Sequence, residues 1–456
     1  MGASGYSSEL EEQIGQWRTY LRRRRSIRPV DVEELEDHLR DQIATLSGAG
    51  LADDEAFFVA VKRMGDLDAL SREFAREYSG RLWKQLVVSG EEANAGRRKR
   101  TEPAVAILLA LTAALAIKVP ELLGLRTLEA HPEFYARNLS LFVFPILTGY
   151  FVWKRGLEGA IRYVYVLPFA GAIVFANAYP LGRESSTLLL TVLHLPIALW
   201  LTVGIAYAGG RWASGDGRMD FVRFSGELFI YYVLFALGGG VLTLFTVRIF
   251  DSIGMDAEWL AEGWLIPCGA MGACVIGAWL VEAKQSVIEN MAPVLTRVFT
   301  PLFAAVLAVF IATMVLTGSV IDVRRDILIA FDLLLVLVLG LLLYAVSARD
   351  PEAAPNGFDT LQLVLVVSAL AVDVVALAAI GARISEFGFS ANKVAALGEN
   401  LILLVNLGWS AWLYSGFVRG RRSFSALERW QTAYLPVYAV WAAIVVVAFP
   451  PLFEFS

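Results

Sequence analysis

The sequence changes character near residue 100, from a charged segment to a succession of long apolar runs. The change falls at the basic cluster Arg97-Arg98-Lys99-Arg100, and the apolar runs begin at Ala104. A hydrocarbon core of roughly 30 Å takes about 20 helical residues to cross, and the runs are of about that length. Unpaired backbone groups are too costly in lipid, so such runs predict α-helices rather than open strands. We therefore expect an all-α, polytopic membrane bundle joined to a charged N-terminal domain.

Composition agrees with this class. Apolar residues make up 57% of the chain, charged residues 18%, and the mean hydropathy is +0.58. These values are typical of a polytopic membrane protein and exclude an ordinary soluble enzyme. The net charge of −5 argues against a nucleic-acid-binding surface. The opening residues are polar, so no secretory signal is expected before the first span.

The first 90 residues are expected to form a small cytoplasmic domain of four amphipathic helices, which we call the head. Apolar residues recur in it at helical spacing in four stretches, which begin at Leu10, Val32, Ala56 and Leu67. Each stretch has one apolar face, so four together can enclose a core while their charged faces stay in water. We expect a basic juxtamembrane linker over 91–103 and the transmembrane bundle over 104–456.

Two basic clusters adjoin the membrane in this arrangement. The first, Arg22-Arg23-Arg24-Arg25, can bind anionic lipid headgroups, where each cation contributes on the order of 1 kcal/mol. The alternative is a solvated helix end, which cations also favour. The second cluster is Arg97, Arg98, Lys99 and Arg100, beside the first span. This cluster is expected to contact lipid headgroups as a topological anchor.

The head resembles a known bacterial family. The resemblance is carried by Glu33-Glu34-Leu35-Glu36-Asp37-His38-Leu39, Gly50-Leu51, Glu55-Ala56-Phe57, Ala60 and Arg63-Met64-Gly65-Asp66. This pattern is similar to the permease prefix domain 1, which precedes bacterial membrane proteins that include transporter permeases. The resemblance implies an N-terminal cytoplasmic accessory or regulatory module with a possible protein partner, and it implies no catalytic residue.

About eleven spans are predicted after residue 100. They cover 104–123, 138–153, 163–181, 187–208, 225–247, 260–281, 298–317, 327–346, 360–381, 393–415 and 431–452. With the head inside, the inner connectors carry more Lys and Arg than the outer ones, although Arg324 and Arg325 go against the bias. The N-terminus is therefore predicted to be cytoplasmic and the C-terminus to be outside.

Small residues suggest close helix packing at two places. Gly269, Ala273 and Gly277 repeat every four residues in the sixth span, which favours the close approach of another helix. In the fifth span Gly238-Gly239-Gly240 suggests either a hinge or a close-packing point, and the absence of an adjacent proline favours packing. Cys268 and Cys274 face different sides of one helix, so no disulfide is expected between them.

Known catalytic and nucleotide-binding motifs are absent from the sequence. It contains no GxxxxGK[ST] loop, no HExxH pair and no GxSxG elbow, so no enzymatic activity and no cofactor is predicted. Of the three histidines only His194 is in a span, which argues against a histidine-built metal site. We expect His194 to be a hydrogen-bonded packing residue.

Polar residues inside the apolar runs are the remaining candidates for a functional site. Asp373 lies near the middle of its span, where an Asp costs about 2.5–3.5 kcal/mol to insert. Asp332 and Glu399 lie at similar heights nearer the outer side. These three carboxylates can line one polar pocket together with Asn400, Asn406 and Arg383. Such a pocket would bind protons or cations, whereas the alternative is a buried polar network that only fixes helix packing.

A second resemblance lies between the ninth and tenth spans. The segment Arg383-Ile384-Ser385-Glu386-Phe387-Gly388-Phe389-Ser390-Ala391-Asn392-Lys393 is similar to the signature R-I-x-x-Y-G-[LF]-T-x-N-R of domain of unknown function 4153, a bacterial multipass family. The chain departs from that signature at Phe387, Ser390 and Lys393. Ser390 is expected to cap the tenth span, and Gly388 to supply a turn.

These features together predict a multipass protein of the bacterial inner membrane. The leading hypothesis is a sensory or regulatory protein, in which the head contacts a cytoplasmic partner and the bundle responds to an envelope signal. The second is a secondary transporter or channel that couples protons or cations to a small solute through Asp373, Asp332 and Glu399. An intramembrane enzyme ranks third. The oligomeric state is left open.

Overall fold

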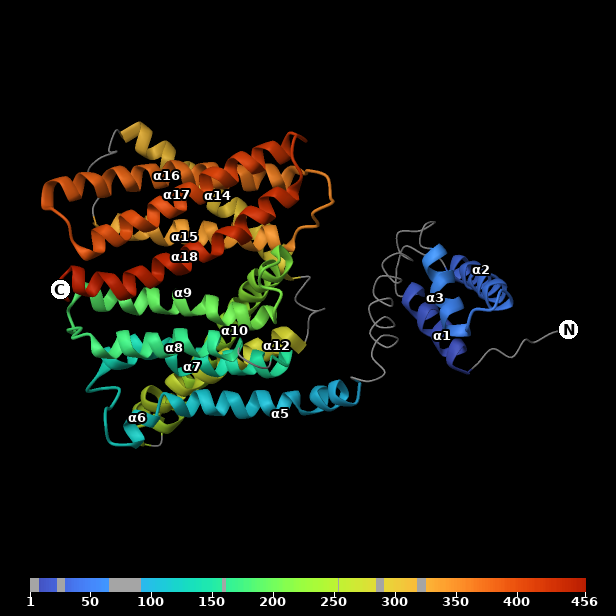
Figure 1. Cartoon of the computed structure of the whole chain (residues 1–456), viewed down its shortest axis with the longest axis horizontal. Helices are drawn as coiled ribbons and strands as arrows, with labels where there is room; N and C mark the ends of the chain where they lie inside the picture. Colours follow the sequence, from blue (N-terminus) through green and yellow to red (C-terminus); the bar gives the residue numbers. More distant parts are fainter. Residues whose placement is uncertain are drawn as a thin grey trace. The chain divides into compact units, whose positions relative to one another are not determined.

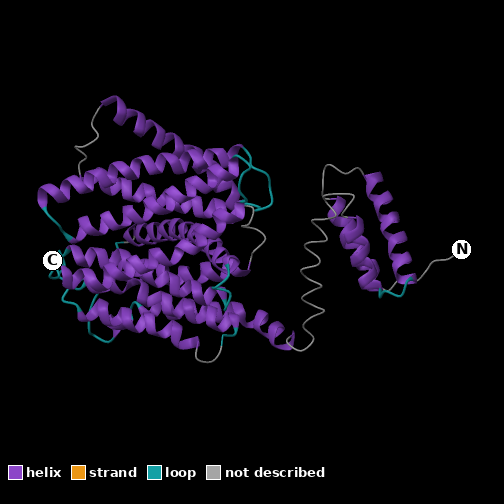
Figure 2. Ribbon diagram, turned by 45° about the horizontal axis from the view of Figure 1, so that its top comes forward, coloured by secondary structure: helices purple, strands orange, loops and turns teal. Residues whose placement is uncertain are grey.

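The computed structural model describes residues 8–22, 29–64, 92–157, 161–252, 254–283, 291–317 and 325–456. Within these ranges every regular element is a helix, as the sequence predicts (Figure 2). The chain divides into two compact units, Met1–Arg100 and Thr101–Ser456. The second unit is a large bundle of long helices (Figure 1).

The first unit contains three described helices: α1 (Ser8–Arg22), α2 (Pro29–Gly48) and α3 (Asp53–Met64). Their apolar faces meet in one core, formed by Leu10, Ile14, Trp17, Leu39, Ile43, Leu46, Ala56, Phe57, Ala60 and Val61. These are residues that the helical spacing assigns to the buried faces, so the predicted core is confirmed for three helices. The expected fourth helix, over 67–78, lies outside the described residues, and the four-helix count stays a prediction.

A continuous helix leads from the basic cluster into the bundle. The expected linker 91–103 lies in α5 (Glu92–Ala116), so its described part is helical. The bundle then continues through α6 (Val119–Leu122), α7 (Pro132–Arg155), α8 (Ile161–Ala178), α9 (Ser186–Ala208), α10 (Gly215–Ser252), α11 (Glu258–Leu260), the π-helical turn η1 (Ala261–Leu265), α12 (Ile266–Ala283), α14 (Met291–Thr317), α15 (Arg325–Ala348), α16 (Gly357–Phe387), α17 (Ala391–Val418) and α18 (Phe424–Leu452).

Seven helical segments of the described chain are long and apolar enough to cross a membrane, which indicates a multipass membrane protein. They are Ser186–Ala208, Gly215–Ser252, Glu258–Ala283, Phe331–Ala348, Gly357–Phe387, Ala391–Val418 and Phe424–Leu452. Shorter apolar helices cover Thr101–Ala116, Tyr165–Ala178 and Thr296–Ala312. A helix lies at each of the eleven predicted places, but α7 is in neither group and buries polar side chains such as Asn138 and Thr148. The count of eleven therefore stays a prediction.

Charged side chains join the helices at one end of the bundle, which we call the Glu102 end. The Nζ atom of Lys154 lies 2.5 Å from Oε1 of Glu102 and 3.1 Å from Oε2 of Glu282, which ties together α5, α7 and α12. Elsewhere at this end Arg349 bridges to Asp359 at 2.8 Å, between the start of α16 and the end of α15. Lys154 and Arg349, two of the basic residues expected in inner connectors, therefore lie at the same end as Glu102.

The opposite end, which we call the Ser456 end, holds the C-terminus. The backbone N–H and the hydroxyl of Thr187 donate to the carbonyl oxygen of Ser456, at 3.0 and 3.1 Å. The side-chain amide of Asn392 donates to the Ser186 hydroxyl at 3.0 Å, which links the starts of α17 and α9. These contacts bring the last residues of the chain beside α9, as Figure 1 shows.

The largest core lies among α14 to α18, where small residues allow close contact. Ala369, Ala376 and Ala379 are buried on the face of α16 that packs against its neighbours. In α12, a Cβ added at Gly277 would lie 2.9 Å from the Leu228 side chain, so the predicted close approach is confirmed there. It is not found at Gly269, which lines a cleft and has no described contact of this kind within 4 Å. The favoured packing interpretation of Gly238-Gly239-Gly240 is wrong, because apart from adjacent residues of α10 no atom of the described chain lies within 4 Å of a Cβ added at any of them. In this part of the bundle α10 and α12 leave a cleft between them.

Candidate functional site

Four helices bring ionisable side chains together inside the bundle. His194 comes from α9, Asp332 from α15 and Asp373 from α16, while Glu399 and Asn400 both come from α17. Consecutive residues of an α-helix point about 100° apart, so the two α17 side chains face different neighbours. Asn400 is hydrogen-bonded to Asp332, and Glu399 lies close enough to Asp332 to act on it electrostatically, so these three members of the predicted pocket lie near one another.

The His194 ring connects α9 to α17. Its Nδ1 atom lies 2.8 Å from the carbonyl oxygen of Leu190, and its Nε2 atom lies 2.5 Å from Oε1 of Glu399. Because a carbonyl oxygen only accepts, Nδ1 must carry a proton, and a neutral imidazole has only one. The Nε2–Oε1 contact then requires a second proton, carried by the ring or by the carboxyl group. The two contacts together therefore need two protons on the His194–Glu399 pair, whereas a neutral histidine beside an ionised glutamate has only one.

Asn400 connects α17 to α15. Its amide nitrogen donates to Oδ1 of Asp332 and to the carbonyl oxygen of Ala396, both at 2.8 Å. The Asn400 side chain is fully buried, and its Oδ1 atom has no hydrogen-bond partner among the described residues. Asn400 therefore keeps one free acceptor next to a carboxylate, inside the membrane-spanning part of the bundle.

Asp373 is the most isolated of these groups. Its exposed fraction is 0%, and neither carboxylate oxygen has a hydrogen-bond partner within the described chain. The charge of Asp332 acts on it electrostatically. An ionised carboxylate without a partner is strongly disfavoured in such surroundings, so the described arrangement requires a neutral Asp373. A group of this kind gains a charge only if the helices around it move or water enters.

Asn406 belongs to a separate polar network on α17. Its amide nitrogen donates to Tyr438 at 2.6 Å and to Gln431 at 3.2 Å, and its Oδ1 atom accepts from Trp430 at 2.7 Å. Asn406 lies six residues from Asn400, which is about 9 Å along a helix. The predicted single pocket therefore divides into two polar clusters, and the second one is satisfied by its own hydrogen bonds to α18.

Arg383, the remaining predicted member, is partly buried near the Ser456 end of α16, and among the described residues no hydrogen bond or ion pair joins it to the carboxylates. The turn after it follows the sequence expectation in part. Gly388 has a φ of 72°, and Ser390 occupies the N-cap position of α17 without a side-chain capping bond. Lys393 instead donates to the Gly388 carbonyl at 2.7 Å, which holds the turn.

Only part of the two basic clusters lies among the described residues. Arg22 ends α1, and Arg97, Arg98, Lys99 and Arg100 lie within α5. Arg23, Arg24 and Arg25 lie outside the described residues. Their contact with lipid headgroups stays a prediction.

The sequence does not predict that His194 belongs to this site. A hydrogen-bonded packing histidine was expected, and the bond to Leu190 fits that expectation. Its partner Glu399 is 205 residues away in the sequence, so no local spacing indicates the pair. The one available signal is that both residues interrupt apolar runs with an ionisable group. Within the described chain no three side chains of His, Cys, Asp or Glu are grouped so that they could hold a metal ion.

Comparisons of the chain with protein-family models, with curated proteins and with solved structures gave no match. The class of the protein therefore rests on its helices and composition: it is a multipass, helical membrane protein with a separate helical N-terminal unit. The resemblances to permease prefix domain 1 and to domain of unknown function 4153 stay predictions.

Proposed function

We propose that the chain is a proton-responsive sensory or regulatory protein of the bacterial inner membrane. The observation that carries the proposal is the polar connection His194–Glu399, Asn400–Asp332 and the neighbouring Asp373, contributed by four helices. The bundle would bind protons at this connection, and the head, on the cytoplasmic side, would pass the change to a partner protein.

Proton binding fits the donors and acceptors at the connection. The His194 ring bridges the Leu190 carbonyl oxygen and the Glu399 carboxyl group, and Asp373 is buried without a hydrogen-bond partner among the described residues. Loss of the Asp373 proton would place a second negative charge near Asp332 without a hydrogen bond to stabilise it. The packing of α15, α16 and α17 would then become less favourable. The protonation state thus selects between two helix arrangements, which is what a sensor needs.

A sensor is favoured over a transporter by two features of the chain. It carries a separate helical N-terminal unit, Met1–Arg100, and its sequence contains no nucleotide-binding motif that would couple ATP hydrolysis to transport.

The second candidate is a proton-coupled secondary transporter or channel. It is favoured by the exposure of Glu399, whose side chain is 34% exposed while its partner His194 is buried. The connection thus runs from an accessible carboxyl group to a fully buried one, Asp373, as a proton relay would.

Hydrogen exchange of the reconstituted full chain tests the proposal. We expect α16 and α17 to exchange faster at high pH than at low pH, after correction for intrinsic rates, because an ionised Asp373 without a hydrogen-bond partner would disturb their packing. Asp373→Asn should abolish this difference, whereas the matched control Glu352→Gln, an exposed carboxylate after α15, should retain it. An equal pH response in Asp373→Asn would contradict the proposal. Dissipation of a pH gradient across vesicles by the unmodified chain, but not by Asp373→Asn, would favour the transporter.

A further inference from the structure

A cleft separates the second half of α10 from the segment formed by α11, η1 and α12. Its volume is about 1210 Å³, somewhat more than the roughly 300–1,000 Å³ of small-molecule pockets. Small residues from α10 and α12 line part of it: Gly239, Gly240, Gly269, Ala270 and Ala273. The π-helical turn η1 contributes Ala261, Glu262 and Leu265. π-Turns of this kind occur frequently at functional sites.

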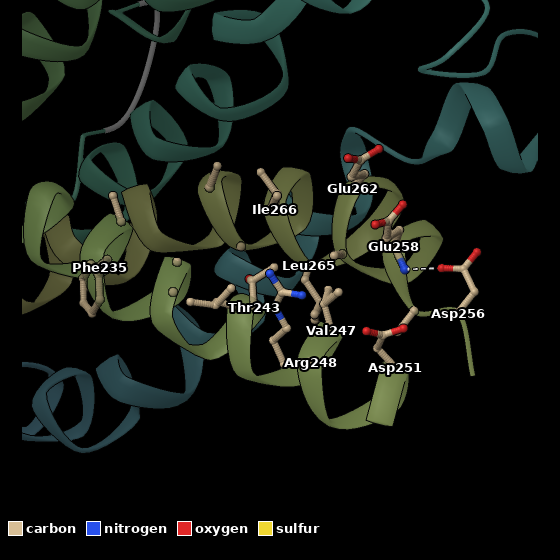
Figure 3. Close-up of a pocket in the computed structure, with 18 of the residues that line it drawn as sticks. Phe235, Thr243, Val247, Arg248, Asp251, Asp256, Glu258, Glu262, Leu265 and Ile266 are labelled. Carbon is tan, nitrogen blue, oxygen red and sulfur yellow. Dashed lines mark hydrogen bonds between the residues drawn. The ribbon is translucent and has the colours of Figure 1, made fainter. Parts of the chain in front are cut away.

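The character of the lining changes along the cleft. Figure 3 shows Phe235 at one end and the carboxylates of Asp251, Asp256 and Glu258 at the other, with Arg248 between them. Arg248 and Asp251 are three residues apart on α10, so they lie on one helix face. An occupant of the cleft therefore meets an apolar wall first, then a guanidinium group, and then a cluster of carboxylates.

The carboxylate end attracts a cation. Asp251, Asp256, Glu258 and Glu262 line the cleft, and within the described chain no ion pair joins them to a basic group. Oδ1 of Asp256 accepts a hydrogen bond from the Glu258 backbone N–H at 2.9 Å, as Figure 3 shows. Asp251 lies in the last turn of α10, where the helix dipole disfavours a negative charge. Helix stability therefore does not explain the Asp251 carboxylate, and a bound cation would offset both the charge and the dipole.

The apolar end adjoins the lipid-facing side of α10. Leu237, Val241 and Phe245 on this half of the helix are 64%, 56% and 61% exposed, which in a membrane means contact with acyl chains. Apart from adjacent residues of α10, no atom of the described part of the chain lies within 4 Å of a Cβ added at Gly239 or Gly240, so the space between these glycines and α12 is open. An acyl chain can therefore lie along these glycines without displacing a side chain.

We propose that this cleft binds a zwitterionic phospholipid whose headgroup ends in a primary ammonium. One acyl chain lies along the glycines, the phosphate contacts Arg248, and the ammonium lies among the carboxylates of Asp251, Asp256 and Glu258. The order tail, phosphate and ammonium in such a lipid matches the order of the groups that line the cleft. Arginine binds phosphate through paired hydrogen bonds, and an ammonium donates three to carboxylates.

Native mass spectrometry of the delipidated full chain in detergent tests this assignment. The probes are dioleoyl phosphatidylethanolamine, phosphatidylcholine and phosphatidylglycerol, added in equal amounts. We expect phosphatidylethanolamine to be retained about tenfold more than either of the others, which corresponds to about 1.4 kcal/mol. Phosphatidylcholine has a quaternary ammonium that cannot donate a hydrogen bond, and phosphatidylglycerol has no cation. Equal retention of the three lipids, or preferred retention of phosphatidylglycerol, would overturn the proposal.

Two adjacent glycines provide a matched pair of variants. Gly239→Leu would fill the cleft, whereas Gly238→Leu adds the same side chain at a position that does not line it. A Cβ added at either position meets no described atom outside α10 within 4 Å, and leucine is a better helix former than glycine, so both variants should fold. We expect Gly239→Leu to lose the lipid preference and Gly238→Leu to keep it. Arg248→Gln should weaken retention without filling the cleft, so the assignment can be judged even if Gly239→Leu does not fold. Unchanged retention in Arg248→Gln would overturn it.

Discussion

Glu399 and Asn400 are consecutive residues of α17 that bind two different helices, α9 through His194 and α15 through Asp332. A small rotation of α17 would therefore lengthen both contacts at once. This geometry makes α17 the element through which a change of protonation at one contact would reach the other. The proposed sensing function depends on this link, because each contact alone joins only two helices.

Substitutions of Glu399 should separate the role of its charge from that of its hydrogen bond. Glu399→Leu leaves Nε2 of His194 buried without a partner, which should reduce the free energy of unfolding by about 1–3 kcal/mol. Glu399→Gln can still donate to Nε2, so we expect a much smaller loss. Equilibrium unfolding of the purified chain in mixed micelles measures both. Equal losses in the two variants would show that the hydrogen bond does not form.

The carboxyl group of Asp373 should not contribute to the free energy of unfolding, although the proposed function depends on it. Asp373→Leu removes two buried oxygens without hydrogen-bond partners and adds apolar contact, so the free energy of unfolding should stay equal or rise by about 1 kcal/mol. The matched variant Asp332→Leu removes the acceptor of Asn400 and should be destabilising by about 1–3 kcal/mol. The same unfolding measurement compares the two. A large loss in Asp373→Leu would mean that its carboxyl group has a partner in the membrane.

The sequence predicts individual buried faces better than it predicts contacts between them. In the head, the spacing of Leu10, Ile14 and Trp17 is enough to identify one side of the core, because a helix repeats every 3.6 residues. In the bundle, an Asp inside an apolar run marks Asp373 and Asp332 as special on energetic grounds alone. These inferences need no knowledge of neighbouring helices.

The parts that sequence reasoning missed depend on which helices become neighbours. Glu399 meets His194 across 205 residues, and Asn406 turns to α18 rather than towards the carboxylates. Gly238 and Gly239 fit a packing motif, but small residues permit close approach without requiring it, and here the opposite helix stays away.

The ion pairs at the Glu102 end should stabilise the attachment of α5. Lys154→Met would leave Glu102, whose side chain is only 17% exposed, without its cation, and should reduce the free energy of unfolding by about 1.5–3 kcal/mol. Glu282 keeps its bridge to Arg155 at 3.1 Å and should be less affected. The double variant Glu102→Gln/Lys154→Met should recover part of the loss, because no unpaired charge remains. An additive double variant would show that the two residues do not interact.

The head should lose stability on acidification through Glu11. Arg40 hydrogen-bonds to both Glu11 oxygens, at 2.6 and 2.9 Å, which lowers the pKa of Glu11 below its ordinary value of 4.5. A lowered pKa in the folded state stabilises the fold above pH 4.5, and this contribution disappears as the pH falls through the folded value. The pair is largely exposed, so the effect should stay below about 1 kcal/mol.

Hydrogen exchange in α1 and α2 of the full chain measures this contribution. Glu11→Gln should exchange faster than the unmodified chain at pH 6 and equally fast near pH 3, after correction for intrinsic rates. Glu12→Gln is the matched control, since Glu12 is exposed and its side chain accepts a long hydrogen bond, 3.5 Å, from Gln16. A difference that persists unchanged at low pH would contradict the assignment to the Glu11 carboxylate.

Gly217 should be the least replaceable glycine at the start of α10. A Cβ added there would lie 2.3 Å from the carbonyl oxygen of Arg211, a backbone atom that cannot turn aside like a side chain. Gly217→Ala should therefore reduce the free energy of unfolding by about 1–3 kcal/mol, despite the higher helix propensity of alanine. Gly215→Ala is the matched control, because its added Cβ meets only the Thr432 hydroxyl at 3.9 Å, an ordinary contact. Thermal unfolding in detergent should show a lower midpoint for Gly217→Ala alone. If both variants unfold at the midpoint of the unmodified chain, the turn from Arg211 to Gly217 can relax, and the close approach does not hold α10 in place.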